Sequence, residues 1–248
     1  MKSNILFALI LGGSHLALGQ VVVNSIDFET SDPVSSYPDF VQYVNGGLAE
    51  GGVYSISGGF LEQRTFTSTG AGYYSFFNNQ LNDLQSLAIE VKLDVISVNG
   101  SFGIGFMAAD GAYRYNLGIT PTGIQLVENT GIVDYSAPIS GSHTYRIESP
   151  ASSGTANLFI DGVFFTSFEA APYSAQNGFN FGDGAGLAFN GGDVNWDYIT
   201  VSQNIALSAV PEPSTYAAIA FGVLGLGLVL KRRLGNRDPA SESNQHQQ

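Results

Sequence analysis

The sequence predicts an all-β sandwich, on two observations. Apolar and polar residues alternate with a period of two over residues 87–95, which gives a strand one face toward a core and one toward water. Runs of this kind recur at a spacing of roughly ten residues, separated by Gly, Asn, Ser and Pro clusters, and none of the central part has a helical period. Strands distributed in this way bury their apolar faces by stacking two antiparallel sheets.

The sharpest local signal is a hairpin over residues 157–168. Asp161-Gly162 lies between two apolar runs, and a type I′ turn needs positive φ at both of its central positions. Asn99-Gly100-Ser101 matches a glycosylation sequon, but we interpret it as an Asn-Gly turn after a strand that ends at Val98. The other predicted strands are 21–28, 60–67, 73–77, 102–108, 113–119, 123–127, 143–147, 185–189 and 194–201.

The N-terminus has the pattern of a signal peptide over residues 1–19. Lys2 precedes an apolar run over 5–11, and Ala17-Leu18-Gly19 places small residues at the two positions that a signal peptidase recognises. We predict cleavage after Gly19, which leaves Gln20 as the first residue. Signal peptidase is therefore an expected partner.

The C-terminus combines a short motif, an apolar run and a basic cluster. Pro211-Glu212-Pro213 leads into an uncharged segment that we predict as a transmembrane helix over 214–230, followed by Lys231-Arg232-Arg233. As a helix, the sixteen residues from Thr215 to Leu230 span about 24 Å, barely enough to cross a membrane. Because basic residues stay in the cytoplasm, the chain before this helix is expected outside the cell and the polar tail over 231–248 inside, disordered.

This three-part arrangement resembles the PEP-CTERM family of bacterial sorting signals. The resemblance rests on Pro211, Glu212, Pro213, the apolar run and the cluster from Lys231 to Arg233. It implies processing by an exosortase, a membrane enzyme that cuts near the motif and releases or re-anchors the protein at the surface of a Gram-negative-type bacterium. The tail after the cluster is longer than the family's usual ending.

Residues 20–203 remain as one domain, joined to the motif by a linker over 204–213. The domain has four basic residues against eighteen acidic ones, a net charge near −14. So acidic a surface repels nucleic acid, which we exclude as a partner. The chain has no cysteine, so the domain depends on an ordinary core rather than on disulfides, and cysteine catalysis is excluded.

Several segments of the domain resemble the concanavalin-like (laminin-G-like) jelly rolls. The resemblance rests on a strand that contains His143-Thr144-Tyr145, a strand that ends at Asp161-Gly162, and a final strand with Trp196-Asp197-Tyr198. It implies a jelly-roll β-sandwich over about residues 25–201, with the last strand paired beside the first. Lectins, hydrolases and structural modules share this fold, so the resemblance indicates a fold more than a function.

The domain offers few residues for catalysis, and we predict that it is not an enzyme. A glycosidase needs two facing carboxylates, and the candidate pairs are Asp27 with Glu29 and Glu90 with Asp94. Both pairs are typical of solvated strand positions. His143, the single histidine of the domain, opens a predicted strand and is expected to have a structural or surface role.

Two kinds of ligand remain open. Calcium takes carboxylate and carbonyl oxygens from loops, and the Gly-rich stretch over 177–197 offers Asp183, Asp193 and Asp197 as candidate ligands. We expect no other cofactor. The function that we predict is that of a non-enzymatic surface or matrix protein. Tyrosines that stack on sugars would instead make the domain a carbohydrate-binding module, with exopolysaccharide as the implied ligand. A glycan-cleaving enzyme is the third alternative. The candidate tyrosines are Tyr37, Tyr43, Tyr73, Tyr74, Tyr113, Tyr115, Tyr135 and Tyr173.

Overall fold

The fold is known from a computed structural model, which describes residues 21–29, 41–44, 53–66, 72–76, 81–99, 104–183 and 191–210. The predicted signal peptide, the predicted strand over 185–189 and the segments from Pro211 onward lie outside these residues. The chain divides into a compact unit that ends at Ser208 and a second unit over Ala209–Gln248. None of the described residues forms a helix long and apolar enough to span a membrane.

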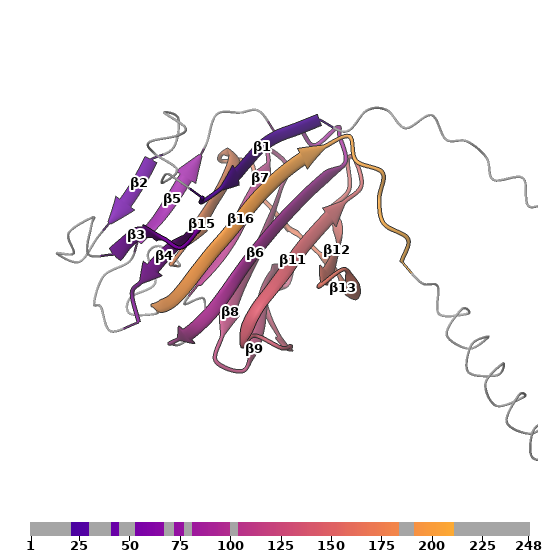
Figure 1. Cartoon of the computed structure of the whole chain (residues 1–248). Helices are drawn as coiled ribbons and strands as arrows, with labels where there is room; N and C mark the ends of the chain where they lie inside the picture. Colours follow the sequence, from indigo (N-terminus) through magenta and orange to yellow (C-terminus); the bar gives the residue numbers. More distant parts are fainter. Residues whose placement is uncertain are drawn as a thin grey trace, which may run out of the picture. The chain divides into compact units, whose positions relative to one another are not determined.

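The first sheet, sheet A, holds the long central strands of the domain (Figure 1). β6 (Leu87–Val98) lies between β11 (Gly141–Ser149) and β16 (Gly192–Gln203), all antiparallel. β1 pairs beside β16, which confirms the predicted pairing of the first and last strands. The other strands are β1 (Val21–Asp27), β3 (Tyr54–Ser57), β4 (Phe60–Arg64), β12 (Thr155–Ile160) and β13 (Val163–Glu169).

The second sheet, sheet B, lies behind sheet A in Figure 1 and has the order β10-β9-β8-β7-β15-β5-β2, with β14 paired to β8. Its pairs are antiparallel as well, so the domain is the predicted all-β sandwich. Its strands are β2 (Val41–Val44), β5 (Gly72–Phe76), β7 (Ile104–Asp110), β8 (Tyr113–Thr120), β9 (Gly123–Glu128), β10 (Gly131–Ser136), β14 (Ala171–Pro172) and β15 (Asn177–Gly182).

One hydrophobic core fills the space between the sheets. Alternation places Ile89, Val91 and Leu93 of sheet A inward, and all three are fully buried. Trp196 is also fully buried and meets the ring of Phe181 edge to face at 5.0 Å. Rings in this geometry attract beyond the area that they bury, so this pair joins the two sheets.

The predicted hairpin is confirmed. β12 and β13 pair up to Ile160↔Val163, and the turn residues Asp161 and Gly162 have φ of 52° and 76°. Positive φ at both positions is the mark of the type I′ turn that matches the twist of two antiparallel strands.

Five strands escaped prediction, and one of them changes the interpretation of a candidate site. β15 lies within the Gly-rich stretch that we expected to supply loop carbonyls to calcium. Phe179 and Phe181 are buried, and Gly178 and Gly182 occupy the alternate positions. Because of its glycines this segment was predicted as a loop, although its inward side chains are as apolar as those of the neighbouring strands. The other four are β2, β3, β10 and β14.

Candidate functional site

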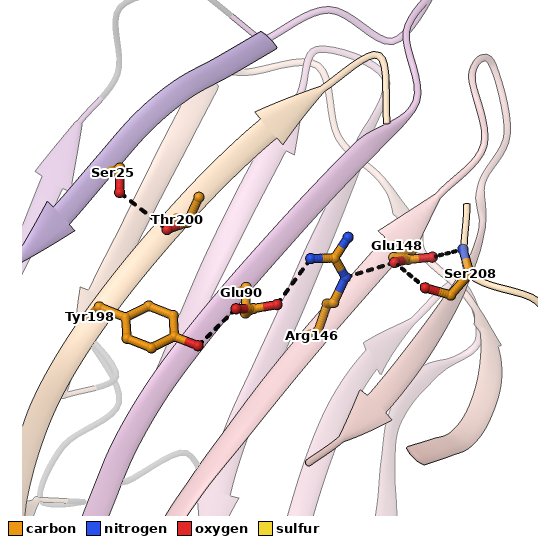
Figure 2. Close-up of polar contacts among 7 residues, drawn as sticks. All are labelled: Ser25, Glu90, Arg146, Glu148, Tyr198, Thr200 and Ser208. Atoms are coloured by element: carbon orange, nitrogen blue, oxygen red, sulfur yellow. Dashed lines mark hydrogen bonds and ion pairs between the residues drawn. The ribbon is translucent and has the colours of Figure 1, made fainter. Parts of the chain in front are cut away.

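A chain of polar side chains crosses the face of sheet A that points away from the core (Figure 2). The Tyr198 hydroxyl donates to Glu90 Oε1 at 2.7 Å, and Arg146 Nη1 donates to Glu90 Oε2 at 2.9 Å. Arg146 Nε continues the chain to Glu148 Oε1 at 2.6 Å. The register places these side chains together, because Glu90 lies opposite Arg146 on one side and opposite Thr200 on the other.

The arginine holds two carboxylates at once, which matters because one of them is fully buried. Glu148 has no exposed side-chain surface, whereas Glu90 is about a quarter exposed. Burial of the guanidinium lowers its pKa, but the hydrogen bonds to Glu148 and Glu90 outweigh this, so the pKa of Arg146 is raised. A permanently charged partner is what a buried carboxylate requires.

The segment after the last strand covers Glu148. Asn204 turns the chain with a φ of 54°, and the buried Ile205 accepts a hydrogen bond from the Ser86 hydroxyl at 2.9 Å. Ser208 then donates twice to Glu148, from its backbone N–H to Oε2 at 2.6 Å and from Oγ to Oε1 at 2.8 Å. The first half of the predicted linker is therefore packed on the domain. We call residues 204–208 the strap.

The outer face of sheet B carries amide side chains in neighbouring strands. Asn180, Met107 and Asn116 lie in one row across β15, β7 and β8. In the next row Gln125 lies opposite Gly118 and donates to Asp134 Oδ1 at 2.7 Å. Only 8 % of Gln125 is exposed, and its Oε1 has no hydrogen-bond partner within the described part of the chain.

Of the tyrosines proposed for sugar stacking whose side chains the structure describes, most do not lie on this face. Tyr74 and Tyr115 are buried in the core, so the prediction is wrong for these two. Tyr135 packs on Phe165 and donates to Glu128, and Tyr173 lies under the guanidinium of Arg114 at 5.6 Å. Tyr113 is half-buried against the core. Tyr37 and the side chains of Tyr43 and Tyr73 lie outside the described residues.

The three calcium candidates have separate partners. Asp197 lies at a bulge in β16 and pairs with Lys92 at 2.6 Å, so a cation already neutralises it. Asp193 accepts from the Phe66 N–H at 3.2 Å. Asp183 is 3 % exposed, and burial raises its pKa from 3.8 to about 7 against the opposing hydrogen bond from Thr65. The described residues contain no group of three acidic or histidine side chains that could hold a metal ion.

His143 fastens the hairpin turn to the neighbouring strand. Its Nδ1 lies 2.7 Å from Asp161 Oδ2, and Asp161 Oδ1 accepts from the Thr144 N–H at 2.9 Å. The backbone hydrogen bond from Thr144, together with His143, lowers the pKa of Asp161. These contacts give the histidine a structural role at the hairpin turn.

The four carboxylates considered for glycoside cleavage all lie in the described part of the chain. Glu90 accepts from Tyr198 and Arg146, and its register partners place it in the polar chain of sheet A. Asp27 lies opposite Tyr198 at the end of β1, and Glu29 lies beside Gly59. Asp94 is opposite Ser142 and Asn195 on the same outer face.

Comparison with known proteins finds a sorting motif in the chain and similar folds among solved structures. Residues 209–233 match the model described as the PEP-CTERM protein-sorting motif. No curated protein matches the sequence. Among solved structures, a carbohydrate esterase from the Shiga toxin-encoding bacteriophage phi24B is 15 % identical, with a TM-score of 0.53 over 75 % of this chain and 100 % of that one. An endo-acting O-glycanase of the human gut microbiota is 12 % identical, with a TM-score of 0.50 over 75 % and 100 %.

The domain thus has the fold of a concanavalin-like jelly-roll β-sandwich. The chain carries a PEP-CTERM sorting motif directly after it, which implies export that depends on an exosortase. Sequence reasoning found the motif but missed the strap and the carboxylate that holds it. The available signal was Arg146-x-Glu148, because residues two apart on a strand share a face.

Proposed function

We propose that this protein is a non-enzymatic component of the cell surface or extracellular matrix of a Gram-negative-type bacterium. Signal peptidase removes the leader, the helix predicted over 214–230 holds the protein in the inner membrane for a time, and an exosortase acts at Pro211-Glu212-Pro213. The observation that carries this proposal is the position of the sorting motif, which begins at the residue after the compact unit ends.

The surroundings of the acidic side chains support a role without catalysis. Glycoside cleavage needs one carboxylic acid and one carboxylate that face each other across a substrate. Glu90 and Glu148 instead share one arginine. On the described outer face of sheet B, amides rather than paired carboxylates occupy the central strands, and Asp134 is held by Gln125 at the edge.

A second candidate function, binding of a neutral glycan such as exopolysaccharide, is favoured by one observation. Within the described residues, Gln125 Oε1 is a buried acceptor without a partner, in the row next to Asn116 and Asn180. Buried polar groups are ordinarily hydrogen-bonded, and a sugar hydroxyl is a donor of suitable size. Uncharged amides suit a neutral ligand better than an ionised one.

Glycan-array binding and release of reducing sugar, measured on the full-length protein in detergent, test these functions together. We expect no turnover of any polysaccharide. If a glycan binds, Asn116→Ala should weaken binding about tenfold through the loss of a hydrogen bond, while Ser25→Ala on the opposite sheet should leave it unchanged. Hydrolysis that persists through purification and disappears on substitution of one carboxylate would contradict the non-enzymatic role.

A further inference from the structure

The strap ends directly before the sorting motif in the sequence. Ser208 is the last residue of the compact unit, and residue 209 is the first of the matched sorting motif. Only Ala209 and Val210 separate Ser208 from Pro211. The residues that a sorting enzyme meets just before Pro211 therefore adjoin a segment that is bound to its own domain.

The strap is held by several independent contacts. The Asn204 N–H donates to the Ser86 carbonyl at 2.9 Å, and the Ser86 hydroxyl donates to the Ile205 carbonyl. The Ile205 side chain is 7 % exposed. At the far end both donors of Ser208 converge on the two oxygens of Glu148 (Figure 2). Hydrogen bonds to an ionised acceptor are about twice as strong as those between neutral groups.

The surroundings of Glu148 suit it to hold the strap. It belongs to the outer face of β11, where side chains ordinarily meet water, yet it is fully buried. Arg146 supplies one charged donor, and the strap supplies the other two described ones. The hydrogen bonds to Glu148 favour the docked strap. If the strap undocks, the carboxylate keeps Arg146 and gains water as a partner, so the strap can detach while the sandwich stays folded.

We infer that the strap is a latch on sorting: the bond between Ser208 and Glu148 sets how often the chain before Pro211 leaves the domain and becomes available to the exosortase. An enzyme that cuts a chain holds several residues of it in a detached form, and cleavage follows the population of the locally opened state. The latch acts before any bond is cut and takes no part in the chemistry. The inference rests on the proposed processing.

The test uses the full-length protein in cells that contain an exosortase, with the conversion of full-length to shortened protein followed by pulse-chase. Ser208→Pro removes both donors, and Glu148→Gln removes the charged acceptor at a position sixty residues away in sequence. Both should be processed about tenfold faster or more, the effect of one lost hydrogen bond to a charged group. Ser208→Thr keeps both donors and should be processed at the wild-type rate.

Ser25→Ala is the matched control, because its hydroxyl is hydrogen-bonded to Thr200 on the same face, 3.3 Å away, and Figure 2 shows it apart from Ser208. Its rate should not change. Normal fluorescence of Trp196 would establish that each variant is folded. If Glu148→Gln is folded and is processed at the wild-type rate, the latch is refuted while exosortase processing stands.

A second measurement separates the latch from the proposed function. In detergent, a protease that cuts beside leucine should cleave at Leu207 faster in Glu148→Gln than in the wild type, and the Ser208 amide should lose its protection from hydrogen exchange. If this occurs but no form is processed in cells, the latch stands and exosortase processing is refuted. A Ser208 amide that exchanges in the wild type as fast as in an unfolded peptide would overturn the latch.

Discussion

Replacement of Pro211, Glu212 and Pro213 by alanine is expected to abolish processing and to leave a full-length form in the membrane. Each proline fixes φ near −65° and lacks an N–H, so the motif favours an extended chain with one charge at its centre. An enzyme that recognises this shape would lose both the backbone conformation and the carboxylate. The loss should be complete, because the substitutions alter the whole motif.

The mass of the mature protein, measured in cells with an exosortase, checks this result. Pro239→Ala is the control, since Pro239 lies in the tail beyond the matched residues 209–233. It should be processed like the wild type. An unchanged mature mass and unchanged release after the triple substitution would mean that the three residues are only a linker.

Replacement of Asp183 by asparagine is expected to stabilise the domain above pH 7 by up to roughly 4 kcal/mol. The side chain of Asp183 is buried, and its Oδ2 has no partner among the described residues. Burial raises its pKa from 3.8 to about 7. A difference of that size between the folded and unfolded states corresponds to the stated free energy.

The sign follows from which state holds the proton. Between about pH 4 and pH 7 the folded protein retains the proton of Asp183 while the unfolded chain has lost it, so the free energy of unfolding falls as pH rises. Asparagine removes this dependence. Urea denaturation, followed by the fluorescence of Trp196, should show the two proteins nearly equal near pH 4 and apart at pH 8. Equal stability at pH 8 would contradict the cost of the buried charge.

The sandwich was predictable from sequence because its strongest elements are locally determined. The alternation over 87–95 and the turn at Asp161-Gly162 each require one structure, and both formed as predicted. β15 was not predictable in the same way. Its glycines have the composition of a loop, and only pairing with β5 and β7 makes its two phenylalanines part of the core.

The same distinction between local and long-range determinants applies to the candidate site. The sorting motif is contiguous, so its residues could be found by inspection of the sequence. The strap depends on Ser208 and Glu148, which only the order of strands brings together. The bulge at Asp197 likewise shifts the alternation of β16, so that Trp196 and Ile199 both face the core. A strict alternation of period two does not predict that shift.

The most direct test of the account is the side of the membrane on which the domain lies. In cells without an exosortase, a protease added to intact spheroplasts should degrade the β-sandwich and leave a fragment that carries the predicted cytoplasmic tail over 231–248. An antibody to that tail would detect the fragment. A domain that resists the protease until the cells are lysed would show that it is not exported, and would contradict the account.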